Sequence, residues 1–474
     1  MRRLAPALAA SILLAAGAAL AGPSSDALPA DATSGAAALQ REELSNGRAF
    51  SIVQSLVDEV GPRLAGSRAD RAAVAWALRT MPTLGLSDVH AERAQVTHWE
   101  RGAEHAEIVA PMKQPLVVAA LGGSVGTPPG GLDAPVVEAA SLDALRKLDP
   151  AAVRGKIVFL NTPMRRTRDG SGYGETVRSR FFGAREAQKL GAVALLLRSV
   201  GTDHDRIAHT GAKSRDEHEI PAAALSVPDA DLLHRELEEN TTVRVRLALG
   251  ARTLPPAGSA NVIGEVPGRE RPDEVVVIGA HLDSWDQGGG AIDDGAGVGI
   301  ALETGRLIAA LPRKPRRTVR VVLFANEEHG LEGAKTYARD HAADAARHVA
   351  ATEADFGGDA VYAVRWLGDP AQRERFVQLA RLLAPLGVER QDDPAGAGAD
   401  VSPLQQLGVP ILDLRQDGTR YFDYHHTPND TLDKIDPPTL AQAAAAFATA
   451  VWAAADMDGD FGRVPDDQRK RTHH

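Results

Sequence analysis

The chain has 474 residues, 44% of them apolar, which is long enough for a large core divided over two or three domains. Its formal net charge of −10 argues against nucleic-acid binding, which usually requires a basic face. The chain contains no cysteine, which excludes a disulfide framework and a lipoprotein attachment.

The first 21 residues have the pattern of a secretory signal peptide. Two arginines precede an apolar run from Leu4 to Ala21, which ends in small residues typical of a cleavage site. The alternative is a membrane anchor, but the run is short and rich in alanine. We therefore expect an exported protein, periplasmic or secreted, with no membrane contact after cleavage. The small and polar residues 22–38 are expected to be disordered.

A change in the sequence pattern near residue 116 predicts an inserted domain. Residues 39–115 combine two helical patterns with an alternating, strand-like segment, and we assign them to the first part of the main domain. From residue 116 to residue 256, short β-like runs alternate with Gly and Pro turns, with two helices expected among them. We therefore expect a separate α+β domain over residues 116–256.

Residues 257–460 alternate between apolar strands and amphipathic helices. This pattern predicts an α/β domain with a mostly parallel sheet covered by helices on both faces. In such sheets the site lies outside the carboxyl ends of the strands. Residues 461–474 form a polar tail that is expected to fray. The expected strands are 274–280, 318–325, 349–353 and 409–414, and the expected helices are 298–311, 331–342, 371–386 and 439–457.

Acidic residues and histidines follow the ends of these strands. His281 and Asp283 form an H-x-D motif, in which the two side chains point to the same side of a strand. Asp283 is thus placed to hold one ring nitrogen of His281 while the other binds a metal ion. Alone, the motif is weak, because an isolated H-x-D is more often structural.

Two carboxylate pairs strengthen this interpretation. Asp293 and Asp294 follow a glycine cluster, where one of them could simply cap a helix. Two adjacent aspartates exceed what a cap needs, so one can bridge two cations. Glu327 and Glu328 would repel each other unless positive charge lies close by. The pleat of a strand would separate them, so that one binds metal and the other holds a water molecule as general base.

Asp355 and His426 complete a set of ligands that favours zinc. Each is a weak signal by itself, at a strand end and in a loop. Together with the pairs above they offer three ligands to each of two cations, one carboxylate being shared. Calcium and magnesium would favour oxygen ligands without histidine. The sequence has no phosphate-binding P-loop.

In combination these motifs resemble those of a known family. The order H-x-D, D-D, E-E, D and H is similar to that of zinc exopeptidases of the aminopeptidase Y and aminopeptidase S type. HWERG at 98–102 and HLDSWD at 281–286 point to the carboxypeptidase Q (plasma glutamate carboxypeptidase) branch. The resemblance extends over nearly the whole chain after the signal peptide. Further matching phrases are GPRLAGS (61–67), GTPP (126–129), GKIV (155–158), HTG (209–211) and HHTPNDT (425–431).

The resemblance implies a three-layer α/β/α zinc aminopeptidase fold with a protease-associated domain at 116–256. It also implies two Zn²⁺ ions per chain and a cis peptide bond at Asp293–Asp294. One zinc would take His281 and Asp355, the other would take Glu328 and His426, and Asp293 would bridge both.

Further roles follow from the same resemblance. Glu327 would be the general base and acid, and Asp283 would orient His281. His425 replaces a tyrosine of many relatives, so His425 or Tyr424 would donate a hydrogen bond to the oxyanion. If the alignment shifts by one residue, His425 and His426 exchange roles. Asp400 and Tyr424 are candidate contacts to substrate.

The expected function is hydrolysis of dipeptides or short peptides that carry a free N-terminus. The resemblance also implies homodimerisation. Two alternatives use the same scaffold, amide deacylation and glutaminyl cyclisation. A more remote alternative is a non-catalytic binding protein, but all five expected ligands and the base are present here.

Overall fold

The computed structural model describes residues 30–216, 218–240 and 242–469. The expected signal peptide, residues 22–29 and the terminal histidines lie outside the described residues. From Ala30 onward the expected disorder is wrong, because α1 (Ala30–Asn46) is a helix. It buries Ala36 and Leu39 in the core that includes α14 (Pro437–Asp456). Among the described residues, no helix combines the length and apolar character needed to cross a membrane.

The described part of the chain contains two sheets of eight strands each, and the one with the longer strands is called the larger sheet. Its strand order is β1-β10-β12-β11-β13-β16-β14-β15. The four central strands β12, β11, β13 and β16 are parallel, whereas the pairs β1–β10, β10–β12 and β14–β16 are antiparallel. The sheet is therefore mixed, and the prediction of a mostly parallel sheet is wrong. The bounds are β1 (Ser87–Glu100), β10 (Arg252–Val266), β11 (Arg271–His281), β12 (Arg317–Phe324), β13 (His348–Glu353), β14 (Val361–Leu367), β15 (Glu389–Pro394) and β16 (Ile411–Gln416).

The physical reason for the mixed sheet lies at its margins. Alternation of strands with helices correctly indicates parallel central strands, which need helical crossovers. At one margin, β1 and β10 are added from outside this repeat. At the other margin, β14 runs against β16. The hydrophobic pattern reports which residues are buried but not which way a strand runs, so these antiparallel strands could not be predicted from it.

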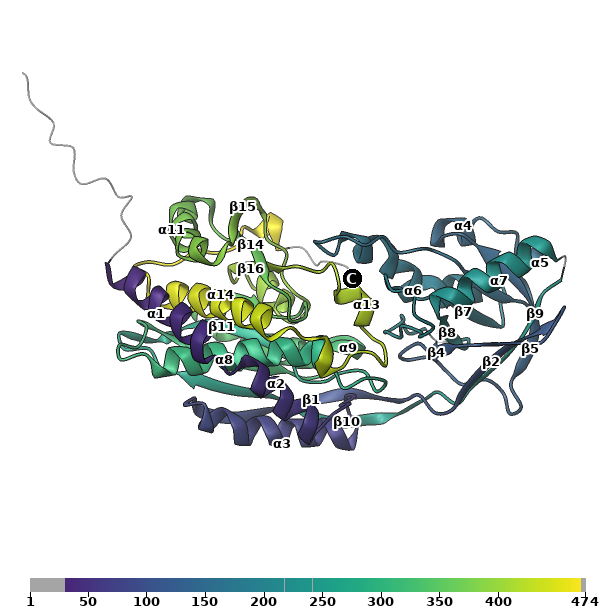
Figure 1. Ribbon diagram of the computed structural model, residues 1–474, viewed down its shortest axis with the longest axis horizontal. Helices are drawn as coiled ribbons and strands as arrows, with labels where there is room; N and C mark the ends of the chain where they lie inside the picture. Colours follow the sequence, from purple (N-terminus) through teal and green to yellow (C-terminus); the bar gives the residue numbers. More distant parts are fainter. Residues whose placement is uncertain (1–29, 217, 241, 470–474) are drawn as a thin grey trace, which may run out of the picture.

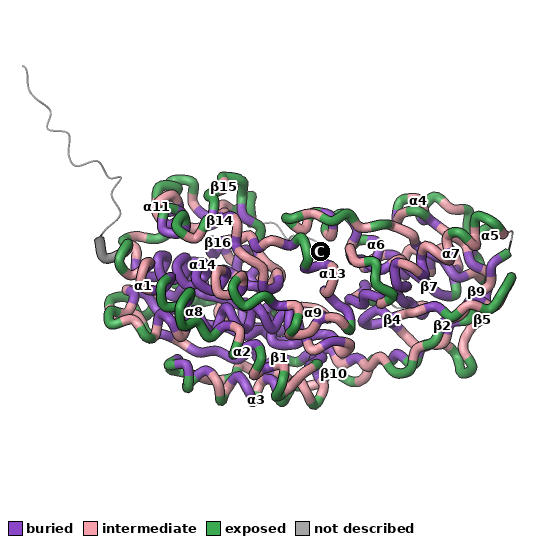
Figure 2. Tube along the Cα trace, in the orientation of Figure 1, coloured by how far each residue is buried: buried purple, intermediate pink, exposed green. Residues whose placement is uncertain are grey.

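Helices cover both faces of the larger sheet. Successive residues of β11 point to opposite faces, so that Val276 and Ile278 join one core and Val275 and Val277 another. The first core includes α2 (Ala49–Glu59), α3 (Arg68–Thr83), α8 (Ala296–Ala310), α11 (Arg373–Leu383) and α14, and the second includes α10 (Glu332–Asp340) and α12 (Ser402–Gln406). Figure 2 shows the buried chain concentrated between these layers.

A second eight-stranded sheet forms the other lobe of the described chain (Figure 1). Its order is β3-β2-β9-β5-β6-β7-β8-β4, again with parallel and antiparallel pairs. It runs from Glu104 to Leu249, so it starts before the expected boundary at residue 116. The bounds are β2 (Glu104–Ala110), β3 (Gln114–Leu116), β4 (Val118–Ala120), β5 (Leu132–Ala139), β6 (Ile157–Leu160), β7 (Ala194–Arg198), β8 (Ala222–Leu225) and β9 (Arg244–Leu249), with helices α4 (Leu142–Arg146), α5 (Pro150–Val153), α6 (Ser171–Lys189) and α7 (Val227–Glu239).

The two lobes are joined by a long antiparallel ribbon and by polar contacts. β1 and β10 pair from Ser87 to Glu100 and continue into the second lobe (Figure 1). Beyond β1, Arg101 donates hydrogen bonds to both carboxylate oxygens of Asp286 and to the carbonyl oxygen of Ala120. The HWERG and HLDSWD phrases therefore meet in space, at the base of the second lobe.

The expected polar tail is ordered as far as it is described. Phe461 and Val464 are buried in the two cores of the larger lobe. Arg463 donates hydrogen bonds to the carbonyl oxygens of His348 and Leu407. These apolar and polar contacts anchor the segment, so the expectation of fraying is wrong up to residue 469.

Acid is expected to weaken the fold through His348, at the start of β13. The ring is buried, with Nε2 3.0 Å from Tyr337 Oη and Nδ1 3.2 Å from Asp344 O. Burial, with Arg320 and His341 nearby, lowers its pKa to about 4. The ordinary histidine value is about 6.5, so below that pH the unfolded chain binds a proton that the folded chain resists.

This contribution to stability is complete above about pH 6.5 and is lost as the pH falls towards the folded pKa. It amounts to at most about 3 kcal/mol. We expect the free energy of unfolding, measured with denaturant near neutral pH and near pH 5, to fall less with acid for His348→Gln than for the natural chain. Equal losses in the two proteins would assign the acid sensitivity to other groups.

Candidate metal centre

The expected acids and histidines meet at the carboxyl ends of the central strands. His281 is the last residue of β11, and Asp355 follows β13. Glu327 and Glu328 open the short helix α9 (Glu327–Gly330) directly after β12. Parallel strands end at the same edge of a sheet, so residues far apart in sequence converge there.

Asp293 lies at the centre of this cluster, in the turn Ala291–Gly295. Its Oδ1 lies 3.1 Å from His281 Nε2, which is itself 3.6 Å from Asp355 Oδ1. Its Oδ2 lies 3.2 Å from His426 Nε2, which is also 3.1 Å from Glu328 Oε2. The two oxygens of one carboxylate therefore face two separate groups of donors.

The backbone around Asp293 is held by buried carboxylates. The Asp293–Asp294 peptide bond is cis, as expected. Asp294 accepts hydrogen bonds from the main-chain N–H groups of His281 and Gly297, both at 3.0 Å, so it caps the helix as one of the pair was expected to do. Asp430 accepts from the N–H of Ile292 at 2.6 Å and of Asp293 at 3.3 Å.

A buried arginine from the GPRLAGS phrase supports the same loop. Arg63 is fully buried, and its guanidinium donates to the carbonyl oxygens of Leu282, Gly289 and Gly290. This contact links α2 and α3 to the glycine-rich segment before Asp293. The sequence contained the phrase but no signal for this role.

The adjacent glutamates diverge, although a strand pleat is not the reason. Asn326 adopts a left-handed conformation, with φ at 58°, and ends the strand before Glu327. The helical turn then directs Glu328 towards His426, where the Trp285 indole donates to its Oε2 at 2.5 Å. The main-chain N–H of Glu327 donates to Asp283 Oδ1 at 3.0 Å, and its side chain lines the cleft.

Asp283 also lies beside His281, as the H-x-D motif predicts. Its carbonyl oxygen is 3.1 Å and its Oδ1 is 3.6 Å from His281 Nδ1. Burial opposes protonation of the imidazole, but Asp283, Asp293 and Asp355 outweigh it and raise the pKa of His281 well above its usual range.

The donor set fits metal ions. Burial, and then repulsion between neighbouring carboxylates, raises the pKa of Glu327 and Glu328 well above the usual range. Within the described residues, Asp293 Oδ2 and Glu328 Oε1 have no hydrogen-bond partner. Bound cations would neutralise this charge and occupy the free lone pairs. Two groups have ligand atoms within 4.8 Å of one another, namely His281, Asp293 and Asp355, and Asp293, His425 and His426.

The rings of His425 and His426 stack on each other. The centroids are 3.4 Å apart and the planes are inclined by 21°. His425 Nε2 lies 3.6 Å from Asp293 Oδ2, whereas His426 Nε2 contacts both Asp293 and Glu328 at shorter distances. His426 is therefore the better placed ligand. Burial, and then the neighbouring His426, lowers the pKa of His425 well below its usual range, which leaves a neutral ring in the cleft.

The two expected substrate contacts are placed differently from the ligands. Tyr424 does not line the cleft, because the turn α13 (Tyr421–Tyr424) directs it into a separate small cavity near Arg420. Its role as a contact to substrate therefore stays a prediction. Asp400 is buried beneath the cleft wall, where burial and then the charge of Glu353 raise its pKa well above the usual range. Its role in substrate binding stays a prediction.

A cleft of about 960 Å³ opens onto the cluster between the two lobes. The second lobe contributes residues of α6 and the segment 212–215, and the larger lobe contributes α9, β16 and α13. The individual residues that the second lobe contributes were not predicted, because no local pattern marks them. The side chains that line the cleft include Tyr173, Arg180, Lys213, Glu327, Glu328, His425 and His426.

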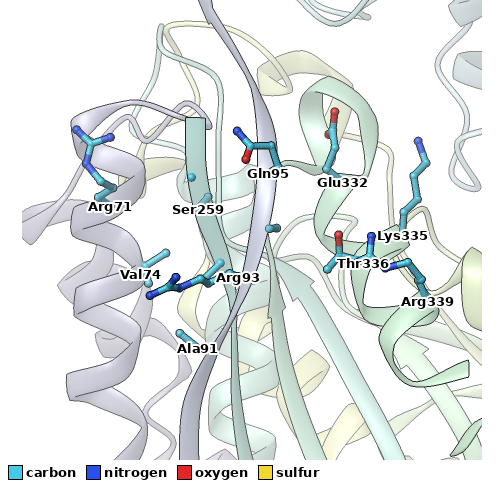
Figure 3. A pocket seen from close by; sticks show the side chains of 13 residues that line it. Arg71, Val74, Ala91, Arg93, Gln95, Ser259, Glu332, Lys335, Thr336 and Arg339 are labelled. Atoms are coloured by element: carbon cyan, nitrogen blue, oxygen red, sulfur yellow. The ribbon is translucent and has the colours of Figure 1, made fainter. Parts of the chain in front are cut away.

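Another groove, of about 950 Å³, lies between α3 and α10 over strands β1 and β10 (Figure 3). Basic side chains dominate its rim, and Glu332 is the one carboxylate among its described lining residues. It contains no histidine, so it lacks the donors that a zinc site requires. Of these two cavities, the cleft between the lobes is therefore the one that carries the candidate chemistry.

The fold and the clustered donors define a metallopeptidase, and comparison with known proteins agrees. Residues 261–451 match the model of peptidase family M28. The chain is 38% identical to carboxypeptidase Q of Mus musculus over 413 residues, which covers 87% of this chain and 86% of that protein. The crystal structure of a peptidase M28 precursor from Shewanella amazonensis SB2B is 46% identical, with a TM-score of 0.90, and covers 92% of this chain and 99% of that one.

The fold extends to more distant proteins. The zinc aminopeptidase BSAP of Bacillus subtilis superimposes with a TM-score of 0.64 at 21% identity, over 89% of this chain and 98% of that one. This chain belongs to peptidase family M28. It is a zinc-dependent metallo-exopeptidase, as the resemblance of its motifs predicts.

Proposed function

We propose that the chain binds two zinc ions and hydrolyses dipeptides or short peptides that carry a free N-terminus. The observation that supports this proposal is the position of Asp293, whose two carboxylate oxygens face two separate groups of donors. A single bridging carboxylate between two such groups is the arrangement that a two-metal hydrolase needs.

Each ion would have its own set of protein ligands. His281 and Asp355 would hold one ion, Glu328 and His426 would hold the other, and Asp293 would belong to both. Mixed imidazole and carboxylate donors favour zinc over calcium or magnesium. When bound, two zinc ions supply Lewis acidity towards a carbonyl group and lower the pKa of a water molecule.

The remaining steps belong to the protein. Glu327 accepts a proton from the attacking water and returns it to the leaving amine. Asp283 fixes both the main chain at Glu327 and the ring of His281. The neutral ring of His425 lines the cleft, where an N–H group can donate to the oxyanion of the tetrahedral intermediate.

A panel of substrates tests this function directly. The purified protein should hydrolyse dipeptides at least about tenfold faster than N-acylated amino acids or peptides with N-terminal glutamine. Chelation should abolish the activity and added zinc should restore it. Preferred turnover of an acylated amino acid would indicate an amide deacylase, and formation of pyroglutamate would indicate a cyclase. No turnover in any arm would leave only a binding protein.

Three further proposals concern the context of the enzyme. Residues 1–21 act as a signal peptide that exports the chain to the periplasm or the medium. The second lobe corresponds to a protease-associated domain that shapes the substrate cleft. The enzyme forms a homodimer, which the resemblance to its family supports. Size-exclusion chromatography of the enzyme and N-terminal sequencing of the exported product test the third and the first of these.

A further inference from the structure

A buried arginine of the second lobe faces the cleft without a carboxylate partner. Arg180, on α6, is 6% exposed and lines the cleft. Its Nη2 donates to Tyr173 Oη at 2.7 Å, its Nη1 lies 3.5 Å from His426 Nδ1, and its Nε has no hydrogen-bond partner. In the part of the chain that the structure describes, no Asp or Glu oxygen lies within 4.0 Å of its guanidinium nitrogens. Buried cations are normally paired, so this one requires an anion.

The chain makes room for this guanidinium. Gly211 has a φ of 128°, and a Cβ atom there would lie 2.4 Å from both Cζ and Nη1 of Arg180. The preceding Thr210 donates its main-chain N–H to the carbonyl oxygen of His426 at 3.0 Å. The HTG phrase therefore seats the arginine directly beside the imidazole of a candidate zinc ligand.

Other cations of the same wall are engaged or exposed. Lys213 is buried, but its Nζ contacts Glu219 at 2.7 Å and the carbonyl oxygen of Ser214 at 3.2 Å. Arg215 is exposed to solvent. Arg180 is thus the cation of this wall that combines burial with an unmet demand for negative charge.

We propose that Arg180 binds the C-terminal carboxylate of the substrate and thereby selects dipeptides. This inference rests on the proposed function and names the substrate class of the same site. In a dipeptide the carboxylate carbon lies about 4 Å from the scissile carbonyl carbon. His426 faces Asp293 and Glu328 with Nε2 and Arg180 with Nδ1, so the guanidinium lies one imidazole ring beyond the ligand atoms.

A dipeptide whose scissile carbonyl lies at the metal centre can therefore place its carboxylate against the guanidinium. Arginine and carboxylate form charge-assisted hydrogen bonds, often in pairs. A longer peptide would place a neutral amide there and leave the buried charge without a partner. The binding of the second residue thus discriminates by charge as well as by size.

The test compares a dipeptide with its C-terminal amide. For the natural enzyme, KM should be lower for Ala-Leu than for Ala-Leu amide. Arg180→Gln should raise KM for Ala-Leu by about 30-fold, the loss of one charged contact, and leave KM for the amide within about threefold. Arg180→Lys should restore part of the difference in KM between Ala-Leu and its amide. Arg178→Gln, exposed on the same helix, is the matched control and should change neither value.

If Arg180→Gln raised KM equally for Ala-Leu and for Ala-Leu amide, Arg180 would merely support His426, and the inference would be overturned. Zinc content and melting temperature of every variant report whether the fold survives. If Arg180→Gln does not fold, leucine should still inhibit the natural enzyme better than leucinamide, and equal inhibition would overturn the inference as well. Equal turnover of dipeptide and amide refutes this inference alone, whereas turnover of neither refutes the proposed function.

Discussion

Glu327→Gln is expected to lower kcat for dipeptides by about 10³-fold while the zinc content stays unchanged. Glutamine keeps the size of the side chain but cannot take a proton from water. The main-chain hydrogen bond from Glu327 to Asp283, at 3.0 Å, does not involve the substituted carboxylate, so the turn should persist. The measurements are kcat for Ala-Leu and zinc per chain by mass spectrometry.

Glu389→Gln is the matched control for this experiment. Glu389 is exposed on β15, far in sequence from the cluster, and its variant should keep full activity. Loss of zinc together with activity would make Glu327 a ligand instead of the base. Full turnover by Glu327→Gln would refute its catalytic role outright.

The central part of the fold could be predicted from the sequence because its strands are almost wholly buried. β11, β12 and β13 are runs of apolar residues between amphipathic helices, a pattern typical of parallel strands covered on both faces. β15 was missed for the opposite reason. Its residues, Glu389–Pro394, are mostly polar and exposed, and an edge strand needs only main-chain hydrogen bonds to one neighbour.

The ligand cluster was predictable to the same extent as the strands that position it. His281, Asp355 and the glutamate pair each follow a predicted strand, so their convergence follows from the geometry of a parallel sheet. His426 is different. It adopts a φ of 62° and stacks on His425, and this depends on contacts to the second lobe such as that from Thr210. No local pattern encodes such contacts, and for this reason the stacking of the two rings could not be predicted from the sequence.

The same limit applies to the residues that line the cleft. Arg180 and His426 lie 246 positions apart in the chain and meet only because the two lobes pack together. Tyr424 was expected in the cleft because it lies next to the histidines, but a single helical turn directs it elsewhere. Proximity in sequence was therefore a poor guide in this loop, whereas position at a strand end was a good one.

Asp293→Asn is expected to abolish both zinc binding and hydrolysis. Asparagine preserves the shape of the side chain, but it replaces one of the two oxygens that face the separate donor groups by an NH₂ group and removes the charge. At most one of the two donor groups then keeps three ligand atoms, and neither keeps the negative charge that both would share. Zinc per chain, measured after dialysis, should fall towards zero, and activity should fall below detection even with added zinc.

Thermal unfolding provides an independent measure of the same change. Zinc bound only by the folded state stabilises it by about 4 kcal/mol at a concentration about 1,000 times its Kd. Zinc should therefore raise the melting temperature of the natural chain but not that of Asp293→Asn, and a chelator should bring the two closer together. Asp458→Asn, whose side chain is 88% exposed, is the control and should respond to zinc like the natural chain. A zinc-dependent rise of equal size in Asp293→Asn would show that the stabilising metal lies elsewhere, because no other described carboxylate joins both donor groups.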